Sequence, residues 1–202
     1  LTLPIWIVCF YPTEAGFIVK SHGRIWAELT GLKGDTPTRM LYSAHGLLKK
    51  RVNGGKPYQV QVEVTVRAIA AGVSNSRVEN IVWSQSWVGP LECSEPATED
   101  EIVRVGDDGC RVVISPLAFI SEHLEVLVEL GTEFGEFVAE KGGLRYRRVA
   151  TVGVGRSFID GLANTVRGLL GSAPHSVAAR GRRICAAIWG RCSSDLEVPA
   201  NG

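Results

Sequence analysis

Short apolar stretches alternate along the chain with longer segments in which apolar positions recur at helical spacing. The apolar stretches predict strands near residues 1–9, 39–44, 78–84, 111–118 and 146–152. The helical spacing predicts helices near 57–72, from about 98, and at 121–141, 157–171 and 183–190, with a helix or an irregular connection over 17–32. Strands that alternate with helices in this way predict an α/β protein with a parallel sheet, right-handed crossovers and flanking helices.

Four glutamates fall on one face of the helix predicted over 121–141. They are Glu122, Glu125, Glu129 and Glu133. Ser121 is suited to cap the start of this helix, and His123 lies in its first turn. The opposite, buried face is expected to consist of Leu124, Leu127, Val128 and Leu130. Like charges at this spacing repel by about 0.2–0.5 kcal/mol per pair, so the row is either a solvated face or a place that holds a cation.

A histidine at the end of a second strand favours the cation. The strand at 39–44 ends in a turn of small residues that carries His45, and the strand at 111–118 turns over Pro116 into the acidic helix. Open α/β sheets bind ligands at the carboxyl ends of their strands. An imidazole and a carboxylate row at one edge predict a site for a divalent transition metal with nitrogen and oxygen ligands.

Residues 43–47 read Ser-Ala-His-Gly-Leu, followed by Gly55, Pro57 and Tyr58 at the spacing of a Gly-Asp-Pro-Tyr turn. These segments resemble signatures of the ferrochelatases, the family that inserts ferrous iron into porphyrin. The other matching segments are 85–90, 116–133 and, in the version found in alphaproteobacteria, 11–17. The resemblance spans about residues 1–170 and corresponds to the C-terminal part of a family member.

The resemblance implies a role for each polar residue of the candidate site. His45 and Glu125 correspond to the catalytic and iron-binding pair, with Glu129 and Glu133 as an acidic path toward the metal and His123 as a neighbour. The implied reaction is insertion of Fe(II) into protoporphyrin IX, the step of haem biosynthesis that yields protohaem. Ferrous iron would be a substrate, and no resident cofactor is expected.

The resemblance also implies an architecture. Residues 1–171 would form a Rossmann-like, chelatase-type domain, the second half of a two-domain fold, and residues 172–202 a C-terminal tail. The N-terminal domain that forms the other wall of the porphyrin cleft would precede Leu1, so the fragment alone is expected to be inactive or slow. Tyr11 and Tyr58 are candidates for contact with the porphyrin, the alternative being that they are packing anchors.

Other positions depart from the family pattern and keep two alternatives open. Leu48 replaces a proline, Lys56 replaces an aspartate, and Gly131 stands where the acidic row usually has one more carboxylate. Trp87 replaces a basic residue, and Cys93 replaces a tryptophan. Reduced aromatic area favours a non-catalytic metal- or tetrapyrrole-binding remnant. A cobalt-type chelatase of the same fold is the second alternative, because affinity alone does not exclude cobalt.

Composition narrows the class of partner. The 202 residues include 45% hydrophobic and 21% charged side chains, with 22 basic and 21 acidic residues and a net charge of +1. This balance argues against a nucleic-acid partner. The sequence has no apolar run long enough for a membrane span and no basic leader, so a cytoplasmic location is expected, with peripheral membrane contact left open.

Cysteines give one further candidate site. The chain has five, and Cys185 and Cys192 lie where some ferrochelatases bind a 2Fe-2S cluster. Such a cluster needs four ligands, usually all cysteine. Because the tail offers two, we predict free thiols in place of a cluster.

Overall fold

A computed structural model describes residues 6–8, 10–45, 57–73, 77–85, 104, 108–143, 145–170 and 176–177. Within these ranges the side chains of 7, 45, 83–85 and 176–177 are outside the description. The helices predicted from about 98 and at 183–190 also fall outside the described residues, as do Cys185 and Cys192.

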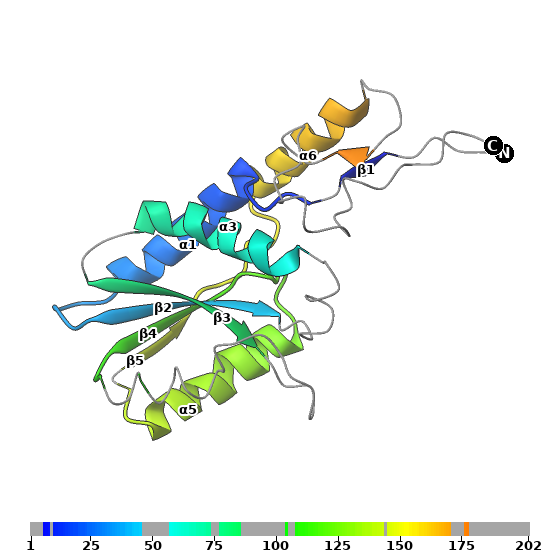
Figure 1. The fold of residues 1–202 in the computed structure, drawn as a ribbon. Helices are drawn as coiled ribbons and strands as arrows, with labels where there is room; N and C mark the ends of the chain where they lie inside the picture. The colour runs from blue at the N-terminus through cyan, green and yellow to red at the C-terminus, as the bar shows by residue number, and fades with distance from the viewer. Residues whose placement is uncertain are drawn as a thin grey trace.

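Within these described ranges, four parallel strands form the central sheet in the order β3-β2-β4-β5 (Figure 1). Their bounds are β2 Thr38–His45, β3 Val78–Gln85, β4 Arg111–Pro116 and β5 Arg145–Arg148. Every residue of β4 is buried, as expected for a parallel strand covered on both faces. The predicted parallel α/β sheet is confirmed. The last strand is shorter than predicted, and a positive φ of 53° at Gly153 helps to turn the following segment toward the next helix.

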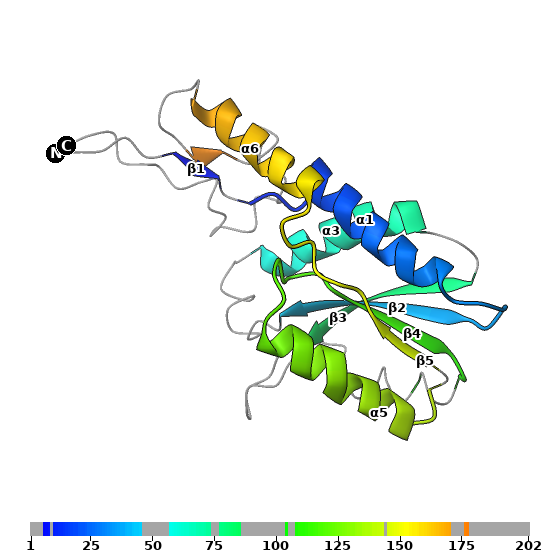
Figure 2. The same cartoon turned by 180° about the vertical axis from the view of Figure 1, so that it is seen from behind.

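Helices cover both faces of this sheet (Figures 1 and 2). On one face lie α1 (Ala15–Thr30) and α3 (Tyr58–Val73), packed on a cluster that includes Met40, Tyr42 and Val113. On the other face lie η1 (Glu125–Glu133) and α5 (Phe134–Glu140), packed on a cluster that includes Leu41, Val112 and Ile114. Consecutive residues of a strand therefore pack into opposite layers of the core, because side chains alternate along a strand.

The helix α1 begins earlier than the sequence pattern predicts. The Glu14 carboxylate accepts hydrogen bonds from Gly16 N at 2.8 Å and from Phe17 N at 2.6 Å. These bonds satisfy two amides that have no partner within the helix. Glutamate is not among the preferred capping residues, so the sequence pattern misses this start.

The last described helix extends the layer made by α1. This helix, α6 (Arg156–Leu170), packs against α1 beyond the sheet (Figure 2). Phe158 of α6 meets Phe17 edge to face, with ring centroids 5.6 Å apart. Phe158 also lies near Tyr11, which precedes α1, with 6.4 Å between the ring centroids.

Two short strands pair away from the main sheet. β1 (Ile7–Val8) runs parallel to β6 (Ser176–Val177). Of the strand predicted at 1–9, residues 7 and 8 are thus observed as a strand, and β6 lies within the segment interpreted as a tail. Among the described residues, no helix combines the length and the apolar character needed to cross a membrane.

Candidate functional site

The carboxyl ends of β2 and β4 meet at one edge of the sheet. Ser43 is paired with Pro116, the last residue of β4, and β2 continues for two more residues to His45. His45 is therefore the final residue of its strand, not part of the following loop as predicted. Its side chain lies outside the described part of the structure.

Backbone hydrogen bonds fasten the loop that follows β4. The amide of Leu117 donates to Ser43 O at 2.9 Å, which ties the loop to the strand that ends in His45. Farther along, the Gly153 amide donates to Ile120 O at 2.7 Å. The chain is thus held against two neighbours just before the acidic helix begins.

The acidic helix differs from the predicted α-helix in where it starts and in its hydrogen bonding. Ser121 is not its N-cap, and His123 precedes its first turn, because helical structure begins at Leu124. Over η1 the backbone forms a π-helix, in which amides bond to carbonyls five residues back, as Phe134 N does to Glu129 O. Such helices are rare and often occur at functional sites.

The π-helix also buries a different face from the one predicted. Val126 and Leu130 are fully buried against the sheet, and Phe134 and Val138 continue this line along α5. Of the four residues predicted to be buried, Leu130 alone is. The other three, Leu124, Leu127 and Val128, are 78%, 49% and 42% exposed. Spaced three and four residues apart, Leu124, Leu127 and Val128 form an exposed apolar ridge on this helix.

Glu122 does not belong to the carboxylate row. Its carboxylate turns toward the chain after β5, where it pairs with Arg148 at 2.9 Å and accepts a hydrogen bond from Thr151 N at 2.8 Å. Partial burial raises the pKa of Glu122, but the bonds from Thr151 and Arg148 outweigh it and hold the pKa below its ordinary value. The sequence gives no signal of this pairing, because the partners lie far along the chain.

The other three glutamates remain on one helix at intervals of four residues. Glu125 and Glu129 are half-buried, and Glu133 is exposed. Because a π-helix has more residues per turn than an α-helix, residues four apart lie slightly less than one turn apart and stay close to one line. His123 lies just before this row, with its ring edge-to-face against Phe119 at 4.9 Å between centroids.

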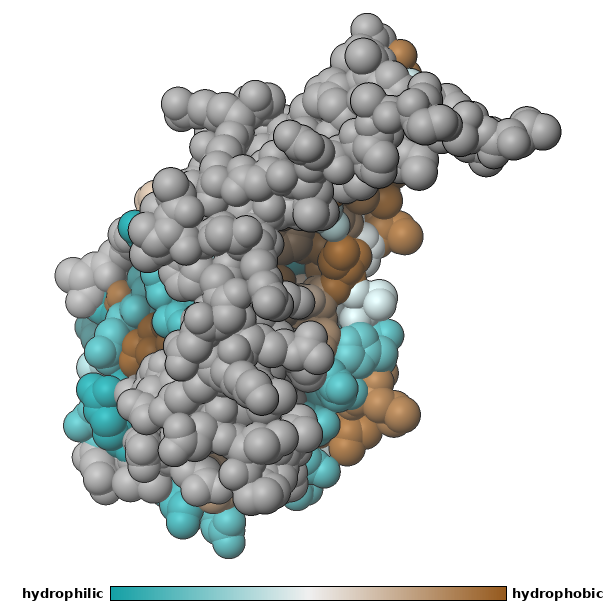
Figure 3. Space-filling view, turned by 45° about the vertical axis from the view of Figure 1, so that its right-hand side comes forward, coloured by the Kyte–Doolittle hydropathy of each residue, from teal (hydrophilic) through white to brown (hydrophobic). Residues whose placement is uncertain are grey.

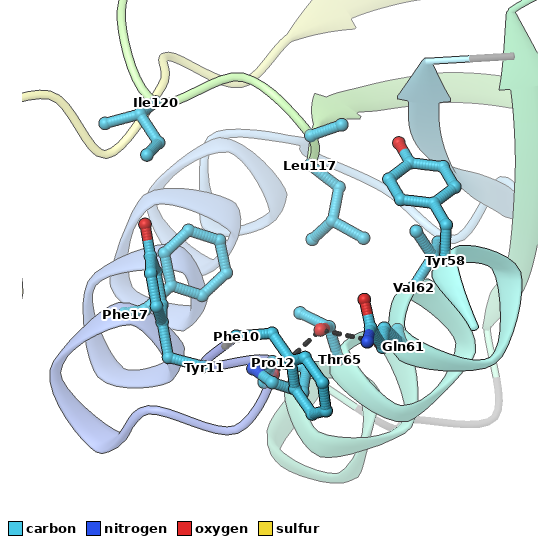
Figure 4. A pocket seen from close by; sticks show the side chains of 11 residues that line it. Phe10, Tyr11, Pro12, Phe17, Tyr58, Gln61, Val62, Thr65, Leu117 and Ile120 are labelled. Carbon is cyan, nitrogen blue, oxygen red and sulfur yellow. Dashed lines mark hydrogen bonds between the residues drawn. The ribbon is translucent and has the colours of Figure 1, made fainter. Parts of the chain in front are cut away.

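Tyr11 and Tyr58 lie on opposite sides of one cavity (Figure 4). Its volume is about 210 Å³, and its other walls are largely apolar. Leu117, which follows β4 directly, lies between the two tyrosines. Thr65 fixes one wall by donating to Pro12 O at 2.7 Å. The sequence pattern does not indicate four further lining residues, because the folded chain brings them together from distant segments: Phe10, Phe17, Leu117 and Ile120.

The described residues do not by themselves complete a metal centre. No group of three or more histidine, cysteine, aspartate or glutamate side chains lies close enough to hold a metal ion in the part of the chain that the structure describes. Because the His45 side chain is outside the described part of the structure, a metal-binding pair that includes it is not covered by this result. Leu117 of the tyrosine cavity is tied to Ser43 of β2, and the same loop leads on to the acidic row of η1.

Comparison of the sequence with known proteins relates the chain to a family. The family model described as Ferrochelatase matches residues 2–169. A ferrochelatase of Caulobacter vibrioides (strain NA1000 / CB15N) is 45% identical over 184 residues, which cover 90% of this chain and 52% of the relative. A ferrochelatase of Rickettsia bellii (strain OSU 85-389) is 35% identical over 202 residues, 98% of this chain and 56% of the relative.

The match is long along this chain and partial along its relatives. A third ferrochelatase, from Phenylobacterium zucineum (strain HLK1), is 40% identical over 191 residues, 92% of this chain and 53% of the relative. The chain therefore spans about half the length of the curated relatives it matches. Because the family model covers most of the chain, the chain belongs to the ferrochelatase family.

Proposed function

We propose that this chain supplies the metal-handling half of an enzyme that inserts Fe(II) into protoporphyrin IX to form protohaem. The observation that carries the proposal is the meeting of β2, which ends in His45, with the loop that leads from β4 into the acidic helix. Imidazole and carboxylate ligands suit a divalent transition metal. Ferrous iron is the substrate, and no resident cofactor or iron–sulfur cluster is assigned.

The chemistry requires a metal site that releases its ion and a base that accepts two protons from the pyrrole nitrogens. His45, with an ordinary pKa near 6.5 for histidine, accepts a proton or binds the metal as neutral imidazole at physiological pH. Glu125 is the opposing ligand or proton acceptor. Glu129 and Glu133 continue as a path along the helix toward solvent, and His123 is a neighbour of the pair.

Porphyrin contact is assigned to the cavity between Tyr11 and Tyr58. Its apolar walls suit part of a flat macrocycle, and the aromatic side chains offer large contact areas. At about 210 Å³ the cavity is smaller than the roughly 300–1,000 Å³ of small-molecule pockets. This small volume supports our proposal that a further part of the protein completes the porphyrin site.

The first half of the longer relatives is the part we assign to that role, with residues 1–171 as the second domain. The exposed apolar ridge formed by Leu124, Leu127 and Val128 supports this assignment, because exposed apolar surfaces often mark sites of contact with another protein surface. Apolar areas reach the surface on the face seen in Figure 3. We further propose a cytoplasmic location, with membrane contact limited to the periphery.

The test is anaerobic metallation, followed by the absorbance change of protoporphyrin IX on addition of Fe(II). We expect turnover when the chain is joined to the first half of the Caulobacter vibrioides relative, and slow or no turnover from the chain alone. That first half without the chain serves as the control. Equal rates with and without the added half would disprove the need for a second domain.

Two other outcomes would identify a different function. No turnover from the joined protein would favour a non-catalytic binding remnant. Faster insertion of Co(II) than of Fe(II) would favour a cobalt-type chelatase. The same absorbance measurement therefore decides among the three functions.

A further inference from the structure

Two side chains of the edge strand β5 contact the acidic π-helix at its two ends. Tyr146 and Arg148 are two residues apart, so they point to the same face of the strand. The Tyr146 hydroxyl donates a hydrogen bond to Leu130 O, near the end of η1. Arg148 pairs with Glu122, three residues before η1 begins.

The Tyr146 hydroxyl donates to a carbonyl that does not receive its usual amide hydrogen bond from within the helix. In an α-helix the amide of Phe134 would donate to Leu130 O, four residues back. Here that amide donates to Glu129 O, five residues back, and the chain then continues as an α-helix. A change from the longer to the shorter spacing leaves one carbonyl without its usual amide, and buried carbonyls need a partner. The Tyr146 hydroxyl fills that vacancy at Leu130.

The surroundings of Tyr146 fit this role. Its ring lies against Gly135, where an added Cβ would come within 3.1 Å of the ring. Burial raises the pKa of Tyr146 well above its ordinary value, so the hydroxyl remains a donor at any physiological pH. The absence of a side chain at Gly135 thus leaves room for the Tyr146 ring beside the transition from η1 to α5.

We propose that Tyr146 and Arg148 are positioning residues that hold η1 in its π-helical register and thereby set where Glu125 and Glu129 lie. Loss of the hydroxyl lets the Phe134 amide return to Leu130 O. That change turns the preceding residues by one α-helical step, about 100°. The consequence for metal binding rests on the proposed function, whereas the control of register does not.

The test compares two tyrosines in the full chain. Tyr146→Phe removes the hydroxyl that serves the helix. Tyr42→Phe is the matched control, because the buried Tyr42 hydroxyl donates to Asn80 Oδ1 at 2.9 Å, within the sheet and away from η1. The readouts are amide NMR shifts and hydrogen exchange over residues 125–135, together with the Kd for Zn(II) from calorimetric titration.

We expect Tyr146→Phe to shift the amide signals around 130–135 and to weaken Zn(II) binding at least about fivefold, a change of about 1 kcal/mol. Tyr42→Phe should lower the melting temperature while leaving those amides and the Kd unchanged. Unchanged amide signals in Tyr146→Phe would overturn the inference. Equal weakening of Zn(II) binding by both variants would also overturn it.

A second variant covers failure of the first to fold. Arg148→Gln should shift the amides at the start of η1 and weaken Zn(II) binding, and wild-type signals at those amides would contradict the role of Arg148. If the parent chain binds no Zn(II) while the amides still shift in the variants, the proposed metal site is wrong and the positioning role stands. The two claims therefore fail separately.

Discussion

Replacing Glu125 with glutamine should lower the rate of metallation at least about a hundredfold, the low end of the contribution of one positioned acid or base. Glu125 is half-buried at the start of η1, on the side where the chain arrives from the sheet edge. Glu133 lies at the exposed end of the same helix, so Glu133→Gln should mainly raise the metal concentration required. Initial rates of the joined protein across a range of Fe(II) concentrations separate the two effects.

The control for this comparison is Glu136→Gln in α5. Glu136 is exposed and does not continue the spacing of the acidic row. The metallation rate of Glu136→Gln should therefore stay within about twofold of that of the parent. Small and equal effects at Glu125, Glu129 and Glu133 would show that the row is a solvated face. Exposed carboxylates away from any site change free energies by less than about 0.5 kcal/mol.

Replacing Gly16 with alanine should cause the largest loss of stability among single methyl additions in α1. A Cβ at Gly16 would lie 1.9 Å from Ser157 O and 2.6 Å from its carbonyl carbon. Both are backbone atoms, so α1 and α6 must separate. Overpacking of this kind costs about 1–3 kcal/mol of the free energy of unfolding. Thermal melting of the chain should therefore shift down by several degrees.

A second glycine of α1 provides the control. Gly23 is exposed and has no atom within 4 Å of an added Cβ, so Gly23→Ala should raise the free energy of unfolding by up to about 1 kcal/mol through helix propensity. Thermal melting of both variants under one condition should show a lower melting temperature for Gly16→Ala and a higher one for Gly23→Ala than for the parent. Equal melting temperatures would mean that α1 and α6 do not approach as closely as described. The contact also concerns the site, since Tyr11 and Pro12 lead directly into this end of α1.

The sheet could be predicted because each strand is a short apolar run followed by a turn. The runs at 39–44, 78–84 and 111–118 lie within one or two residues of the observed strands. Their alternation with helices was enough to predict parallel pairing. The start of α1 could not be predicted, because the capping residue is Glu14, whose side chain is not typical at that position.

The acidic helix was predicted as an element but not in its detail. The spacing of Glu125, Glu129 and Glu133 fits an α-helix and a π-helix almost equally well. The choice between them depends on the long-range contacts that Tyr146 and Arg148 make from β5. The Arg148 contact also holds Glu122 away from the row, which a local pattern cannot indicate.

We propose above all that His45 and Glu125 bind one metal ion at the sheet edge. X-ray absorption at the zinc edge of the Zn(II)-loaded chain measures this directly, because imidazole ligands give a distinct scattering pattern and a Zn–N distance of about 2.0–2.1 Å. We predict an imidazole signal in the parent chain that His45→Ala abolishes, and a reduced number of oxygen ligands in Glu125→Gln. A spectrum that is the same in the parent and in both variants would contradict the account.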